Sequence, residues 1–268
     1  MKKYVNLFVF VFMIGACLSQ GRAQTKSAVS YKNPVVDIAM PDPTVIKAAD
    51  GYFYVYATES TRNVPIMKSK DLVEWTYCNT AFTNKTRPRF EPKAGIWAPD
   101  INYINGKYVL YYAMSVWGGE QTCGIGVATA NSPQGPFTDH GKMLRSNEIG
   151  VQNSIDPSLL QYEGRNYLVW GSFRGIYVIE LTADGLSIMP GAKKKRIAGT
   201  AFEAVYIHKH DDYYYMFASI GSCCQGVKST YKVVVGRSKK VWGPYKDKTG
   251  KPMLKNGYSL VIGANDHF

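Results

Sequence analysis

Four acidic residues recur at similar places in a repeated pattern. Each precedes or opens a short apolar segment, which leads through a tight turn into an aromatic-rich segment. The acids are Asp42, Asp100, Asp156 and Glu203. If the apolar segments are neighbouring strands, the carboxyl groups gather around one opening. Carboxyl groups that share a pocket repel one another, so their pKa values separate. One protonated group and one ionised group can then serve as general acid and general base.

Hydrolysis of a glycosidic bond by inversion uses such a pair, separated by roughly 6.5–9.5 Å so that a water molecule fits between them. The alternative for each acid is a structural role, in which the carboxylate accepts backbone N–H groups or binds a cation. For Asp100 we expect this structural role.

The elements that must position these acids are predicted to be strands. Turn residues separate the two segments of each repeat: Asp50-Gly51, Asn105-Gly106, Glu163-Gly164 and Asp211-Asp212. Asp-Gly and Asn-Gly favour tight hairpin turns, because both residues tolerate positive φ. Successive acids lie 47 to 58 residues apart, which leaves room for four strands per repeat. The pattern predicts an all-β propeller with little helix; a β-sandwich with coincidental hairpins is the alternative.

Four motifs, taken in order and with their spacing, resemble glycoside hydrolase family 43. They are Pro41-Asp42-Pro43, Trp97-Ala98-Pro99-Asp100, Ile155-Asp156-Pro157 and Phe202-Glu203-Ala204. The resemblance covers residues 33–268 and implies a five-bladed β-propeller of inverting enzymes. The fourth repeat extends to about residue 251, and residues 259–268 look like the opening of another strand. We therefore expect the last blade to be missing from a C-terminally truncated chain.

The resemblance also implies roles for the acids. Asp42 is the expected general base, Glu203 the expected general acid, and Asp156 the residue that orients the acid and keeps its pKa raised. The general base of arabinan-cleaving relatives commonly follows a histidine, whereas Pro41 precedes Asp42 here.

Substrate contacts are expected from three further residues. Trp97 offers an aromatic face for a sugar ring, with core packing as the alternative. Asn153 is expected to hydrogen-bond the sugar, with a turn role as the alternative. Phe173 is a weaker candidate, as is Trp117.

Residues 221–231, together with 235–238 and 243–248, are similar to arabinan endo-1,5-α-L-arabinanases within the family. This similarity implies inverting endo-hydrolysis of α-1,5-linked L-arabinan from plant cell walls. One alternative is an exo-acting α-L-arabinofuranosidase or β-xylosidase of the same family. The alternative from another class is a non-catalytic, carbohydrate-binding propeller on the cell surface.

No cofactor is implied for the chemistry, and no metal ligand is assigned. The family resemblance makes a structural calcium ion at the propeller centre conceivable. His208 and His210 share a strand face, where exposed histidines are commoner than a metal pair. Adjacent cysteines rarely bridge each other. A disulfide from Cys223 or Cys224 to Cys78 or Cys123 is possible, and the sequence does not pair them. By resemblance, the cysteine pair belongs near the cleft.

The N-terminus predicts export. Two lysines, an apolar run over residues 5–16 and Gly21-Arg22-Ala23 form a secretory signal over residues 1–23. Alternatively, Ile14-Gly15-Ala16-Cys17 resembles a lipoprotein signal with Cys17 as the lipidated residue. Residues 24–268 form the expected propeller domain, which is periplasmic, anchored in the outer membrane or extracellular. No transmembrane segment is predicted beyond the signal.

A net charge of +12 would suit a nucleic-acid-binding protein. Export and the scattered distribution of basic residues argue against this partner. Attraction to an acidic polysaccharide is a weaker option. The sequence assigns no oligomeric state.

Overall fold

The computed structural model describes residues 31–263, and these residues form four antiparallel, four-stranded sheets. The first sheet consists of β1 (Thr44–Lys47), β2 (Phe53–Tyr56), β3 (Pro65–Ser69) and β4 (Thr76–Thr80). The second consists of β5 (Gly95–Ile104), β6 (Lys107–Ser115), β7 (Gly124–Ala130) and β8 (Thr138–Arg145). The third consists of β9 (Ser158–Tyr162), β10 (Arg165–Trp170), β11 (Ile176–Glu180) and β12 (Lys195–Ala198). The fourth consists of β13 (Glu203–His210), β14 (Tyr213–Ile220), β15 (Lys232–Ser238) and β16 (Ser259–Ile262).

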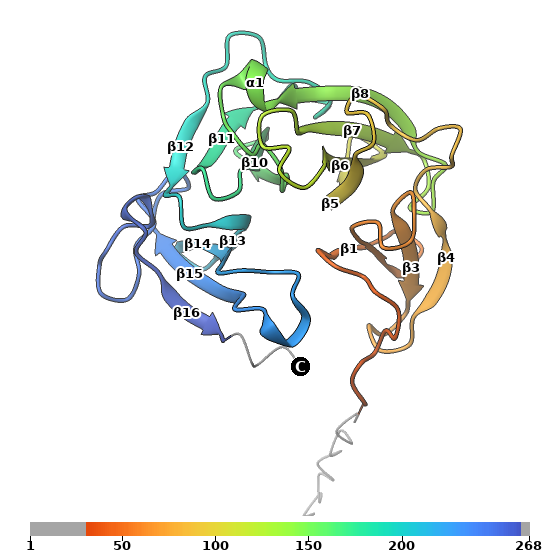
Figure 1. Cartoon of the computed structure of the whole chain (residues 1–268), viewed down its shortest axis with the longest axis horizontal. Coiled ribbons are helices and arrows are strands. Elements are labelled where there is room, and N and C mark those ends of the chain that lie inside the picture. Colours follow the sequence, from red (N-terminus) through yellow and green to blue (C-terminus); the bar gives the residue numbers. More distant parts are fainter. Residues whose placement is uncertain (1–30, 264–268) are drawn as a thin grey trace, which may run out of the picture. The chain divides into compact units, whose positions relative to one another are not determined.

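Helices are short in this part of the chain. They are α1 (Ser146–Ile149) and the 3₁₀ turns η1 (Gly226–Lys228) and η2 (Met253–Lys255). In each sheet the strands follow one another in sequence order, so each repeat of the sequence is one propeller blade. Figure 1 shows the four blades placed around a centre. The all-β propeller prediction is therefore confirmed.

The predicted number of five blades is wrong, because residues 31–263 form four. The error arose at the C-terminal end of the fourth repeat. The sequence suggested that residues 259–268 open another strand beyond the fourth repeat, and the missing blade was expected to follow. Instead, β16 pairs antiparallel with β15, with Val235 opposite Ser259, and supplies the fourth strand of the fourth blade.

Neighbouring blades bury their faces against each other. One core cluster draws on the first and second blades and contains Tyr56, Phe82 and Tyr112. A second cluster joins the second and third blades, and a third joins the third and fourth. The aromatic-rich strands of the sequence pattern therefore contribute to the cores between blades. A sheet can bury its apolar faces only by packing against neighbouring elements. At Gly185 the fit is close, since an added Cβ would lie 2.6 Å from the Tyr111 hydroxyl.

Strand pairing reveals which positions of the four repeats are equivalent. In every blade, a residue two positions before a pair of the first two strands adopts a left-handed backbone, with φ between 41° and 57°. These residues are Asp42, Ala98, Asp156 and Ala204. Their following pairs are Thr44–Tyr56, Asp100–Tyr111, Ser158–Val169 and Tyr206–Phe217.

The sequence alignment had placed all four acids at one position, and this is wrong in two blades. Asp42 and Asp156 occupy the left-handed position of their blades. In the second blade, Asp100 lies two residues after that position, and in the fourth, Glu203 lies one residue before it. The β-bulges between Trp97 and Asp100 and between Glu203 and Tyr206 occur at these places. A bulge inserts an extra residue that a sequence pattern of period two does not reveal.

Asp100 has the structural role expected for it. Its Oδ2 atom accepts hydrogen bonds from the Leu159 backbone N–H at 2.8 Å and from the Asn102 amide at 2.7 Å. The first of these bonds joins the inner strands of the second and third blades. Burial raises the pKa of Asp100 to about 6, and these bonds oppose the rise.

Replacing Asp100 with Ala should lower the free energy of unfolding by about 1–3 kcal/mol, because the Leu159 N–H then lacks its acceptor. Asp100→Asn keeps an oxygen acceptor. Since the pKa of Asp100 is higher in the folded than in the unfolded chain, its ionisation at pH 7 opposes folding. The Asn variant should therefore be at least as stable as the wild type in urea unfolding at pH 7. An Ala variant as stable as the Asn variant would contradict this role.

Candidate active site

Asp42 lies on the loop that enters β1, and its carboxylate is exposed to solvent. The Ala98 backbone N–H donates to Thr58 Oγ1 at 2.7 Å. Because the Thr58 oxygen accepts this bond, its own proton is directed to Asp42 Oδ2, 2.5 Å away. The backbone N–H of Thr58 also donates to the Pro41 carbonyl at 2.9 Å. The first and second blades therefore fix one oxygen of Asp42 and leave the other accessible.

Glu203 is the first residue of β13 and is only 9% exposed. Its Oε2 atom accepts a hydrogen bond from Ser172 Oγ at 2.7 Å. The Asn153 amide in turn donates to Ser172 Oγ at 2.9 Å, which leaves the serine proton for Glu203. Loops before and after strands of the third blade thus orient the acid of the fourth.

Asp156 lies on the loop before β9 and is half-buried. Its Oδ2 atom accepts the backbone N–H of Ala204 at 3.2 Å. Ala204 follows Glu203 directly, so Asp156 holds the backbone on which Glu203 is mounted.

The charges of neighbouring carboxyl groups affect the pKa values of Asp156 and Glu203. Burial, followed by repulsion from Glu203 and Asp42, raises the pKa of Asp156 well above its usual value. Burial also raises the pKa of Glu203, and the charge of Asp42 adds to this rise. Hydrogen bonds with the hydroxyls of Ser172 and Tyr231 act in the opposite direction. A buried carboxyl group with a raised pKa therefore lies within the influence of an exposed carboxyl group, which is the asymmetry that acid–base chemistry requires.

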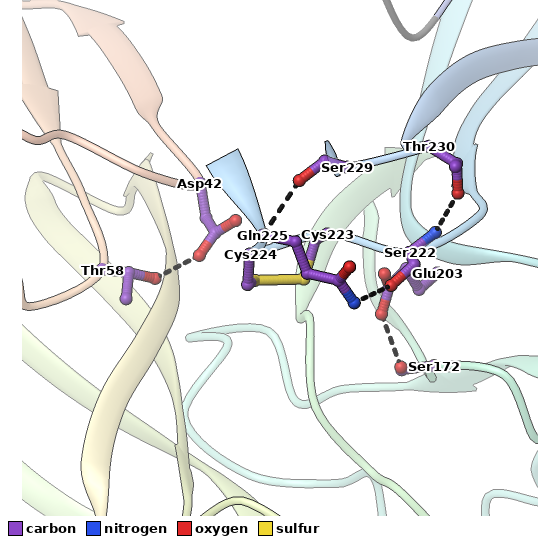
Figure 2. Close-up of a disulfide and its surroundings, with 10 residues drawn as sticks. All are labelled: Asp42, Thr58, Ser172, Glu203, Ser222, Cys223, Cys224, Gln225, Ser229 and Thr230. Atoms are coloured by element: carbon purple, nitrogen blue, oxygen red, sulfur yellow. Dashed lines mark hydrogen bonds between the residues drawn. A yellow bond between two sulfur atoms is a disulfide. The ribbon is translucent and has the colours of Figure 1, made fainter. Parts of the chain in front are cut away.

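The structure thus brings together Asp42, Asp156 and Glu203, while Asp100 serves the blade interface. Figure 2 shows Asp42 and Glu203 with the hydroxyl groups of Thr58 and Ser172 that bond to them. The catalytic roles assigned to the three acids stay predictions.

The three predicted sugar contacts have different surroundings. Trp97 is half-buried against Ala113, Cys123 and Ile155. Its ring centroid lies 5.5 Å from that of Trp117, which is 78% exposed. Trp97 is therefore packed on one side, and its contact with a sugar stays a prediction.

Asn153 has a left-handed backbone, with φ of 55°, and its amide holds Ser172. Its position beside the acid is consistent with either alternative, and a bond to sugar stays a prediction. Phe173 is half-buried, and its backbone N–H donates to the Phe202 carbonyl at 2.9 Å. Its contact with substrate also stays a prediction.

Sequence reasoning did not identify the hydroxyl groups that hold the acids. Thr58, Ser172 and Ser219 close the aromatic-rich segments of the first, third and fourth repeats. Thr58 and Ser172 bond to the acids directly, and Ser219 bonds to Tyr231. The second repeat, whose acid is structural, ends in Ala113. This difference between the repeats was the available signal.

The adjacent cysteines differ from expectation. Cys223 and Cys224 form a disulfide with each other, whereas Cys78 and Cys123 are free thiols. The open possibility of a bridge to either of these two is therefore wrong. Adjacency did not prevent the bond, and Cys224 lies in the left-handed region with φ of 70°.

Within residues 31–263, no three or more His, Cys, Asp or Glu side chains are grouped so that they could hold a metal ion. The described side chains therefore assign no ligands to the calcium ion that the family resemblance made conceivable. His208 and His210 are both exposed on β13, as expected. None of the helices in this part of the chain is long and apolar enough to span a membrane. The signal peptide and Cys17 lie outside the described residues.

Comparison with known proteins adds independent evidence. The Extracellular endo-α-(1→5)-L-arabinanase 1 of Bacillus subtilis is 38% identical over 241 residues, covering 85% of this chain and 73% of the relative. A crystal structure of exo-1,5-α-L-arabinanase from a bovine ruminal metagenomic library superposes with a TM-score of 0.76 at 33% identity, covering 88% of this chain and 83% of that one.

The structure of Cellvibrio cellulosa α-L-arabinanase complexed with arabinohexaose also has a TM-score of 0.76 at 33% identity, covering 84% of this chain and 79% of that one. A family model described as Glycosyl hydrolases family 43 matches residues 31–266. The chain therefore belongs to glycosyl hydrolases family 43, as its four motifs predicted.

Proposed function

We propose that this chain hydrolyses α-1,5-linked L-arabinan in endo mode, with inversion at the anomeric carbon. The observation that carries the proposal is the meeting of an exposed Asp42 with a buried Glu203 whose pKa is raised. The family and the arabinanase relatives bear out the predicted glycoside hydrolase, in preference to a non-catalytic binding propeller. Chemistry in this family needs no cofactor.

We assign each acid a step. Glu203, whose pKa is raised by burial and by the nearby Asp42 charge, donates a proton to the leaving glycosidic oxygen in this proposal. Asp42 accepts a proton from water, whose oxygen attacks the anomeric carbon as the bond to the leaving oxygen breaks. Attack from the opposite face inverts the configuration. Asp156 orients the Glu203 backbone through the Ala204 N–H.

Arabinan or an arabino-oligosaccharide is the substrate that the relatives support, since one of them was solved with arabinohexaose. Both endo-acting and exo-acting enzymes occur among the similar proteins. The endo-acting Bacillus subtilis protein has the higher identity of the two described, which favours endo action. Exo action is the second candidate.

Export is part of the proposal. The Bacillus subtilis relative is named extracellular, which supports secretion. We assign residues 1–23 to the signal and 24–268 to the enzyme domain, with lipidation at Cys17 as the alternative way of anchoring an exported chain.

Glu203→Ala should reduce the rate of arabinan hydrolysis by roughly 10²–10⁴-fold, because proton donation to the leaving group is lost. Reducing-sugar release from debranched arabinan measures the rate. Binding of arabinohexaose, measured by calorimetry, should persist. Unchanged hydrolysis in this variant would remove Glu203 from the role of general acid.

Ser172→Ala should shift the alkaline limb of the kcat/KM profile to higher pH. The Ser172 hydroxyl stabilises ionised Glu203, so its removal raises the pKa of the acid, which then keeps its proton further up the pH scale. Ser187→Ala, an exposed serine in the third blade, is the matched control. A limb that stays in place, or moves to lower pH, contradicts the assignment.

Linear α-1,5-arabinan should yield a mixture of oligosaccharides early in the reaction, which chromatography of the products would show. Internal bonds are cleaved at random in endo action, so average chain length falls quickly while little monosaccharide forms. Release of arabinose alone from the start would instead establish exo action.

A further inference from the structure

The disulfide between Cys223 and Cys224 lies on the loop formed by residues 221–231, which joins β14 to β15. Ser219 on β14 pairs with Glu203 on β13, and Cys223 follows Ser219 by four residues. Four residues span at most about 14 Å of chain, so the disulfide stays close to the acid. The surroundings of the disulfide drawn in Figure 2 include both Asp42 and Glu203.

Hydrogen bonds close the base of this loop beside Glu203. The Thr230 N–H donates to the Ser222 carbonyl at 3.0 Å, and the Ser222 N–H donates to Thr230 Oγ1 at 3.1 Å. Tyr231, the last residue of the loop, hydrogen-bonds with Glu203 through its hydroxyl. Both ends of the loop are therefore fixed, and its tip has a defined place beside the carboxyl groups.

Polar groups near the tip are occupied within the loop. The Gln225 amide donates to Ser222 Oγ at 3.1 Å, and the Gln225 backbone N–H donates to Ser229 Oγ at 3.0 Å. Figure 2 shows these bonds surrounding the disulfide. The sulfur atoms belong to the accessible surface of the loop, since Cys224 is exposed and Cys223 is half-buried.

A disulfide between adjacent residues closes a small ring, which fixes both side chains in one conformation. Such a group is apolar and has little conformational entropy left to lose when another molecule packs on it. A furanose ring presents C–H groups on part of its surface, and these gain from contact with an apolar, preorganised partner.

We propose that the Cys223–Cys224 disulfide is a substrate-binding surface of the active site, against which the C–H face of an arabinofuranosyl unit packs. This inference rests on the proposed function and adds a contact to it. The sulfur atoms take no part in bond breaking. They supply binding that is equal in the ground state and the transition state, so their loss should raise KM and leave kcat unchanged.

The double variant Cys223→Ala/Cys224→Ala tests this with linear arabino-oligosaccharides as substrate. Loss of the sulfur surface should raise KM about fivefold, with kcat and the alkaline limb of the pH profile unchanged. Val227→Ala is the matched control, because Val227 is 85% exposed on the same loop and forms no part of the disulfide. Its KM should match that of the wild type.

Reduction of the wild type provides a test without mutation. Dithiothreitol transfers two electrons and two protons to the disulfide, giving two thiols and a cyclic disulfide of the reagent. Free rotation of the two thiols should raise KM, whereas the double variant should not respond. Thermal unfolding of each form checks that the fold is retained.

An unchanged KM in the double variant overturns the proposal. A fall in kcat with a displaced alkaline limb also overturns it, because the disulfide would then act through Tyr231 and Glu203 as a brace. If the wild type cleaves no arabinan, the proposed function fails. Binding of arabinohexaose by calorimetry, compared between wild type and double variant, then still decides whether the disulfide contacts sugar.

Discussion

The site depends on one backbone conformation, which recurs in every blade two residues before a pair of the first two strands. Asp42, Ala98, Asp156 and Ala204 each hold a left-handed φ, which costs a non-glycine residue roughly 1–2 kcal/mol. Three core clusters pack the successive blades against one another around these positions. Asp42 and Asp156 occupy this position directly, and Glu203 immediately precedes it in the fourth blade, so acids from distant parts of the sequence come close enough for their charges to interact. The chemistry needs this convergence more than any single contact.

On this common frame, small differences separate the acids. Asp42 is exposed and receives the Thr58 hydroxyl, whereas Glu203 is buried and receives the Ser172 hydroxyl. Both hydroxyls come from a residue two positions after the second strand of a blade. The surroundings of the two carboxyl groups therefore differ in burial and not in the type of hydrogen-bond donor. Asp156 takes a third position, where a backbone N–H is its partner and two like charges act on it.

Much of this architecture could be predicted from the sequence, because hairpin turns and aromatic strands have local signatures. The blade repeat and the meeting of Asp42, Asp156 and Glu203 were predicted in this way. The blade number was not, since whether Ser259 begins a blade or ends one is decided by pairing with β15, a contact that leaves no local pattern. The bulges before Asp100 and after Glu203 were hidden for the same reason. The bridge between Cys223 and Cys224 depends on a left-handed residue that composition does not signal.

Ala98 shows that the second blade lacks an acid at the position equivalent to Asp42 and Asp156. It occupies the position that carries Asp in the first and third blades, and its N–H supports Thr58. A carboxylate there would add a fourth carboxyl group, raise the neighbouring pKa values further and draw protons onto the group that must accept one from water. An enzyme assembled from similar modules therefore works only after its symmetry has been broken. The blade with a neutral residue at this position is as necessary for separating the roles of acid and base as the blades that carry a carboxyl group.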